Sequence, residues 1–112
     1  MFLGLEQAKS IRRVRIRGNS MLPTFKDGDS VLFIFKKNIR FKIGDIVLAK
    51  HPYIKYKLLV KRIKHIKINA EYFLAGDNPD TTQSTDSYSF GYINKKDILA
   101  KSEKDFPLLI NR

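Results

Sequence analysis

One serine in this chain stands in a segment suited to expose it. Ser20 lies in the run Gly18-Asn19-Ser20-Met21-Leu22-Pro23-Thr24, between a basic β-type segment and the turn Asp27-Gly28-Asp29. A turn that follows a strand can present a hydroxyl and leave backbone N–H groups free to stabilise an oxyanion. A serine in a Gly/Asn turn is also an ordinary turn or capping residue. Ser20 is therefore a candidate nucleophile that needs a base beside it.

The best candidate for that base is a lysine. Neither His51 nor His65 has an aspartate in an evident orienting position, and we interpret them as a turn residue and a strand residue. Strand alternation puts Lys61 on the same face as Leu59 and Ile63. Burial lowers the pKa of a lysine, by up to roughly 3 to 5 units when it is complete, and the neutral amine can accept a proton from serine. A lysine that extends its ammonium group to water is the alternative.

Short strands separated by turns must position these two side chains. β-Branched and aromatic residues predict seven strands, at 11–17, 30–35, 46–49, 58–66, 71–75, 91–93 and 98–100. We expect only one helical segment, a short turn over Met21–Phe25 after the nucleophile, with Pro23 near its start. The polar stretch Thr81–Ser87 is expected to be a surface loop. The pattern predicts an all-β fold, a small barrel or sandwich.

Length and composition limit the remaining possibilities. The 112 residues permit one domain, residues 1–112, whose core we place over about 11–100. The absence of cysteine excludes disulfides and thiolate chemistry, and two histidines make a poor metal site, so no metal or cofactor is expected. No apolar run approaches the roughly 18 residues of a membrane span, and no signal peptide is evident. We expect a cytoplasmic protein without a transmembrane segment.

The charge balance favours anionic partners. Lys and Arg number 22 against 11 Asp and Glu, a net charge of +11, which suits nucleic acid, an acidic lipid surface or an acidic polypeptide. The lysines are scattered along the chain, however, and no basic helix organises them. Peripheral membrane contact stays open. A small basic barrel that binds nucleic acid through exposed Phe and Tyr is the non-enzyme alternative.

Four sequence boxes occur in an order found in one superfamily. They are Gly18–Thr24 with Gly28-Asp29, then Gly44–Val47, then Val60–Arg62, and then Gly76–Asn78 through Asp86-Ser87 to Phe90-Gly91. Together they resemble the boxes of type I signal peptidases over roughly residues 14–100, and the chain is identified as a member of this Ser/Lys peptidase superfamily. The resemblance implies a barrel-like all-β protease fold with Ser20 as nucleophile and Lys61 as general base.

The resemblance also implies supporting residues. Ser84 matches the serine whose hydroxyl orients the lysine amine. Asp77 and Asp86 match acidic residues that brace the site, with Arg62 as the ionic partner. Two further positions match residues that shape the turn around the nucleophile: Met21 and Pro23.

The chain departs from the family pattern at several places. Gly18 stands where some members have a serine that helps to stabilise the oxyanion, so this role falls chiefly to the Ser20 backbone N–H. The loop from Asn78 to Asp86 is longer than in the family, which leaves open whether Ser84 or Ser87 orients the lysine. Tyr88 replaces an expected arginine, and the Gly-Leu-Pro-Gly-Asp run that follows the lysine box in many members is absent.

These departures bear on the substrate. Without a membrane anchor or a large second domain, the chain is most similar to the short, soluble nickel-type superoxide dismutase maturation proteases. That similarity implies removal of an N-terminal extension from the dismutase precursor. A type I signal peptidase acting on secretory precursors is the alternative. Self-cleaving repressor domains share the chemistry, but they follow a DNA-binding domain for which we find no room here. The scissile bond and the oligomeric state stay open.

Overall fold

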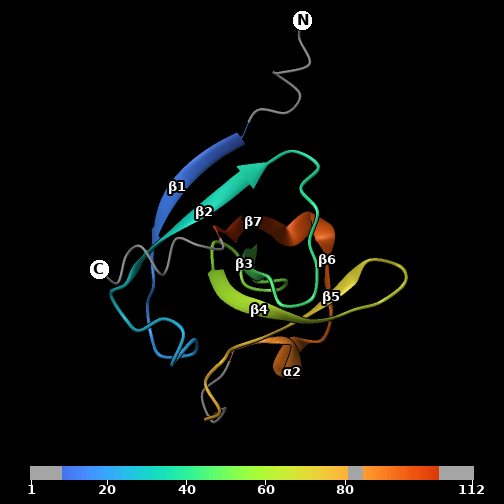
Figure 1. Ribbon diagram of the computed structural model, residues 1–112. Coiled ribbons are helices and arrows are strands. Elements are labelled where there is room, and N and C mark those ends of the chain that lie inside the picture. Colours follow the sequence, from blue (N-terminus) through green and yellow to red (C-terminus); the bar gives the residue numbers. More distant parts are fainter. Residues whose placement is uncertain (1–8, 81–84, 104–112) are drawn as a thin grey trace, which may run out of the picture.

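The computed structural model describes residues 9–80 and 85–103, which form a strongly curved antiparallel sheet (Figure 1). In the sheet the strands follow the order β1-β2-β7-β3-β4-β5-β6. The strands are β1 (Lys9–Arg15), β2 (Ser30–Lys36), β3 (Ile46–Lys50), β4 (Leu58–Ile66), β5 (Glu71–Ala75), β6 (Ile93–Asn94) and β7 (Ile98–Ser102). A short helix α2 (Ser87–Phe90) and a 3-10 turn η1 (Lys95–Asp97) complete the described elements. The all-β prediction is confirmed.

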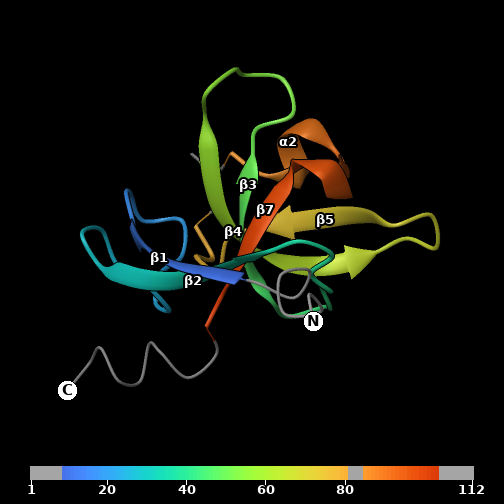
Figure 2. The ribbon, with the colours of Figure 1, turned by 90° about the horizontal axis from the view of Figure 1, so that it is seen from above.

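The strand β7 joins two parts of the sheet. It pairs with β2 through Phe33 opposite Ser102 and with β3 through Val47 opposite Lys101. On one side of it lies the two-stranded ribbon of β1 and β2, and on the other lie β3 to β6 (Figure 2). The last strand in the sequence therefore holds the first two strands against the others.

The core lies on both faces of β3. Ile46 and Leu48 belong to one cluster of buried side chains, which includes Phe33, whereas Val47 and Ala49 belong to a second, which includes Ile63. A strand with both faces buried carries apolar residues at consecutive positions instead of alternating ones. This explains why the run from Ile46 to Ala49 is continuously apolar.

The helical segments differ from the expectation. Met21–Phe25 forms a hydrogen-bonded turn, with the Phe25 N–H donating to the Met21 carbonyl at 2.9 Å, and the Leu22–Pro23 peptide is cis. The helix of the described residues is α2, whose first residue, Ser87, was expected in a loop. Asp86 caps it by accepting a hydrogen bond from the Tyr88 N–H at 3.0 Å. The composition of this stretch suits a loop and a helix N-cap equally.

Candidate active site

The nucleophile loop, residues 17–27, lies at the end of the β1–β2 ribbon. Ile16 extends the ladder, since its N–H donates to the Asp29 carbonyl at 2.7 Å and its carbonyl accepts from the Gly28 N–H at 2.8 Å. The Gly18 N–H then donates to Asp27 Oδ1 at 2.7 Å, which closes the loop. Gly18 has φ 82°, a conformation that glycine adopts without steric cost. The two ends of the loop are thus held together, and Ser20 lies on the loop between them.

The neighbours of Ser20 anchor it to the core, and the backbone N–H of Ser20 is left available as a hydrogen-bond donor. Met21 is buried in the core at 1% exposure, whereas Ser20 is half-buried and Pro23 is exposed. Within residues 9–80 and 85–103, the Ser20 backbone N–H donates no hydrogen bond. The Gly18 N–H is already committed to Asp27. The Ser20 N–H is therefore available to an acceptor oxygen that binds at this position.

Lys61 lies on the buried face of β4. Leu59, Lys61 and Ile63 are all buried, and Lys61 is only 4% exposed. Desolvation by burial lowers the pKa of Lys61 below that of a free lysine, and the nearby charge of Lys57 lowers it further, while the charge of Asp86 opposes both. The net lowering favours the neutral amine that a general base requires.

Ser20 and Lys61 line the same groove, of about 420 Å³. The groove is also lined by residues 14–17, residues 57–60, Met21 and Leu48. Among the described residues no hydrogen bond joins the Ser20 hydroxyl to the Lys61 amine. Catalytic hydrogen bonds often tighten only when substrate binds. The structure thus places the two side chains at one groove without joining them directly.

Two unpaired strand edges border this groove. Among residues 9–80 and 85–103, β1 is the terminal strand of the sheet and pairs only with β2. The first half of β4 pairs with β3 over Leu58–Arg62, whereas its pairing with β5 begins only at Arg62. Residues 58–61 therefore have one edge without a strand partner in the described part of the chain. An unpaired edge is a template for an added extended chain.

A segment distant in sequence clamps the backbone of the nucleophile. Gly76 packs so closely against Ser20 that a Cβ there would collide with the Ser20 carbonyl oxygen. That carbonyl accepts a hydrogen bond from the Asn78 N–H at 2.9 Å, and Asn78 Nδ2 donates to the Asn19 carbonyl at 2.8 Å. Sequence reasoning missed this clamp, although a glycine in the Gly-Asp-Asn box is a possible signal of close backbone approach.

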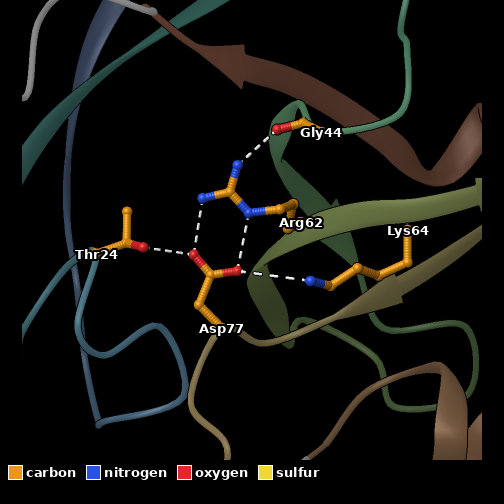
Figure 3. Close-up of polar contacts among 5 residues, drawn as sticks. All are labelled: Thr24, Gly44, Arg62, Lys64 and Asp77. Carbon is orange, nitrogen blue, oxygen red and sulfur yellow. Dashed lines mark hydrogen bonds and ion pairs between the residues drawn. The ribbon is translucent and has the colours of Figure 1, made fainter.

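Asp77, which lies between Gly76 and Asn78 in the sequence, joins the clamp to β4 (Figure 3). Arg62 donates to both of its carboxylate oxygens, from Nε at 2.8 Å and from Nη2 at 2.7 Å, and Nη1 donates to the Gly44 carbonyl at 2.7 Å. Thr24 Oγ1 donates to Asp77 Oδ2 at 2.5 Å, and Lys64 Nζ lies 4.0 Å from Oδ1. One carboxylate thereby ties the nucleophile loop to the strand that carries Lys61.

Asp86 is the second acidic residue of the expected site. It is 1% exposed and caps α2, and its charge favours the protonated form of Lys61. The Ser87 hydroxyl accepts a hydrogen bond from the Leu74 N–H at 2.8 Å, so it supports β5. Ser84 lies outside the described residues.

The other residues singled out in the sequence lie elsewhere. His51 Nδ1 accepts hydrogen bonds from the Tyr53 and Ile54 N–H groups, both at 3.0 Å, and is a turn residue as expected. His65 lies on β4, where its Nδ1 is 2.9 Å from the Tyr92 hydroxyl. Tyr88 packs edge-on against Phe73 and is 75% exposed.

Comparison with known families agrees with this arrangement. The family model described as Peptidase S24-like matches residues 3–101. The chain belongs to this family. Membership confirms the Ser/Lys peptidase superfamily and identifies a serine peptidase of the S24 type. A search of curated proteins gives no match. None of the helices in the described part of the chain has the length and apolar character needed to cross a bilayer.

Proposed function

We propose that this S24-type peptidase is an endopeptidase that uses Ser20 as nucleophile and Lys61 as general base. The observation that carries the proposal is the groove shared by the two side chains, one on a presented turn and the other buried. In this scheme the neutral Lys61 amine takes the proton from Ser20 Oγ as the oxygen attacks the scissile carbonyl. Lys61 then returns that proton to the leaving amine.

The remaining steps use groups already in place. The Ser20 N–H stabilises the negative oxygen of the tetrahedral intermediate. After the amine product leaves, Lys61 deprotonates a water molecule, which attacks the acyl-enzyme and releases the acid product and free Ser20. Arg62, Asp77 and Asn78 act as positioning residues, because they hold the nucleophile loop against β4.

The substrate is an extended polypeptide. The groove lies between residues 14–17 and 57–60, and each segment has an edge that could pair with an added strand. Main-chain pairing supplies affinity that depends little on sequence. Within this class we propose a precursor with an N-terminal extension, and the nickel superoxide dismutase precursor is the specific candidate that the sequence resemblance supports. The net charge of +11 favours an acidic precursor.

Incubation with purified precursors tests the proposal. We expect the wild-type chain to shorten the dismutase precursor, with the new N-terminus read by sequencing, and the Ser20→Ala variant to leave it intact. Cleavage of membrane-inserted secretory precursors, with the dismutase precursor untouched, would support a signal peptidase instead. Unimpaired cleavage by Ser20→Ala would exclude the mechanism.

A further inference from the structure

A second pocket adjoins the catalytic groove. It has a volume of about 590 Å³ and lies against the β3–β4 loop, residues 51–57. Lys57 and Leu58 line both this pocket and the catalytic groove, so the two hollows adjoin at the start of β4. In Figure 2 the loop projects beyond the sheet, away from the β1–β2 ribbon.

The loop presents large apolar side chains to solvent. Tyr53 is 78% exposed, Ile54 50%, Tyr56 95% and Leu58 54%. These are half of the eight large hydrophobic residues that are exposed in the described part of the chain, and they fall within six positions. Such a concentration of exposed apolar surface is typical of a binding site.

The loop is held in shape even though its side chains are exposed. The His51 N–H donates to the Lys57 carbonyl at 2.9 Å, which closes the loop at its base. His51 Nδ1 accepts from two N–H groups within it. Tyr56 has φ 65°, in the left-handed region that is unfavourable for a residue other than glycine. A strained and exposed tyrosine on a closed loop indicates a surface prepared for a ligand.

The charged residues around the pocket limit further the class of ligand that it can bind. Lys50, Lys55 and Lys57 line the pocket, against a single carboxylate from Asp97. The ammonium group of Lys55 lies 5.9 Å from the centre of the Tyr56 ring, so positive charge and aromatic surface occur side by side. This combination complements a large apolar residue with acidic neighbours.

We propose that this pocket is a distal subsite for the peptide substrate, which takes an aromatic or large aliphatic residue flanked by acidic ones. The inference rests on the proposed function. Lys57 precedes Lys61 by four positions, so an extended substrate beside β4 reaches the pocket about four to six residues from the scissile bond, at about 3.3 Å a residue. The two residues that this pocket shares with the catalytic groove favour the peptide substrate as occupant over a lipid surface.

Binding can be tested without catalysis. The probe is a pentapeptide with one phenylalanine between two pairs of glutamates, titrated into isotope-labelled Ser20→Ala protein and followed by amide chemical shifts. We expect shifts at residues 51–58 and at Leu99. The Kd should be at least about tenfold lower than for analogues with alanine at the centre or with lysines as flanks.

Matched variants assign the effect to the pocket. The double change Tyr53→Ser and Tyr56→Ser should abolish the preference for phenylalanine, whereas Ile68→Ser, which removes an equally exposed apolar residue from the β4–β5 turn, should not. Lys55→Glu should weaken binding of the acidic peptide, and Lys96→Glu, outside the pocket, should leave it unchanged.

Three results would overturn the proposal. One is equal affinity for the three peptides, and another is an unchanged preference in the tyrosine variant. The third is a combined result: the protein sediments with phosphatidylglycerol vesicles only when Tyr53 and Tyr56 are present, and it binds the three peptides with equal affinity. That result would make the loop a membrane contact. Because Ser20→Ala is used throughout, failure of the subsite is separate from failure of the catalytic scheme.

Discussion

At the scale of single residues, the proposed mechanism depends on the protonation state of Lys61. Its side chain is 4% exposed, and desolvation is the main reason why its pKa is lowered. Only the neutral amine can accept the Ser20 proton, and a lowered pKa increases its fraction at any pH below the free-lysine value. In the proposed mechanism this buried lysine takes the place of the histidine of more familiar serine peptidases.

We predict that activity rises with pH through a single ionisation, below the value of about 10.5 for a free lysine. Lys61→Met and Lys61→Arg should each lower kcat by about 10³-fold or more, since neither side chain can accept a proton. Cleavage rates across pH 6 to 11 measure both effects, with Lys96→Ala as the control. An acid limb near 6.5 that disappears in His65→Ala would assign the base to histidine instead.

A second prediction concerns Gly76, which has no room for a side chain beside the Ser20 carbonyl. Gly76→Ala should destabilise the fold by about 1–3 kcal/mol and displace Ser20, with loss of activity even in the folded fraction. Gly91→Ala is the matched control: its φ of 85° makes alanine unfavourable, but its Cβ would meet open space. Equal activity per folded molecule in the two variants would contradict the role of the clamp.

At the scale of elements, the Arg62–Asp77 pair connects β4 to the nucleophile loop. Burial tends to raise the pKa of Asp77, but hydrogen bonds from Arg62 and Thr24 outweigh this, and the net pKa is lowered. A carboxylate with a lowered folded-state pKa stabilises the protein above its unfolded-state value of about 3.8. That contribution is lost as the pH falls through the folded-state pKa.

Asp77→Asn should therefore reduce stability at pH 7 by about 1–3 kcal/mol and flatten the acid side of the stability curve. Urea unfolding at pH 7 and pH 3 gives both quantities. The control is Glu71→Gln, which removes a more exposed pair with Lys67 at 3.8 Å and should cost less than about 0.5 kcal/mol. If Asp77→Asn loses no more stability than the control variant, the Arg62–Asp77 pair does not hold the nucleophile loop.

The β3–β4 loop gives a second expectation at the scale of elements. Desolvation, and then the charge of Lys57, lower the pKa of His51, whose Nδ1 must be unprotonated to accept two N–H groups. A base with a lowered folded-state pKa loses its contribution as the pH falls below its unfolded-state value of about 6.5. Amide exchange at Tyr53 and Ile54 should accelerate relative to β3 between pH 8 and pH 5, beyond the intrinsic pH effect. A constant ratio would contradict this role of His51.

The sequence predicts the elements better than their contacts. Alternation along β4 correctly puts Lys61 with Leu59 and Ile63, because period-2 patterns report directly on a half-buried strand. The clamp from Gly76 and Asn78 could not be derived in this way, since it joins residues more than fifty positions apart. Similarly, the capping role of Asp86 was overlooked because capping and loop residues share one composition.

At the scale of the whole molecule, we expect the net charge of +11 to raise the rate at which acidic substrates bind. The three lysines around the second pocket lie beside the catalytic groove, so the positive field extends to the site. We predict that kcat/KM for an acidic peptide falls several-fold when the salt is raised from about 0.05 to 0.5 M, whereas kcat stays constant. A neutral peptide of the same length is the control. Equal salt dependence for both peptides would rule out electrostatic steering.

The position of β7 has a consequence for synthesis of the chain on the ribosome. The nucleophile loop follows β1 and Lys61 lies on β4, but within the sheet these two parts are joined only when Ile98–Ser102 inserts between β2 and β3. A nascent chain must therefore bring β7 out of the exit tunnel before the sheet can join these two parts, and until then, among the hydrogen bonds of the described residues, only those of residues 76–78 can hold the nucleophile loop against β4. We therefore expect a nascent chain that still lacks β7 to be without the peptidase activity proposed above.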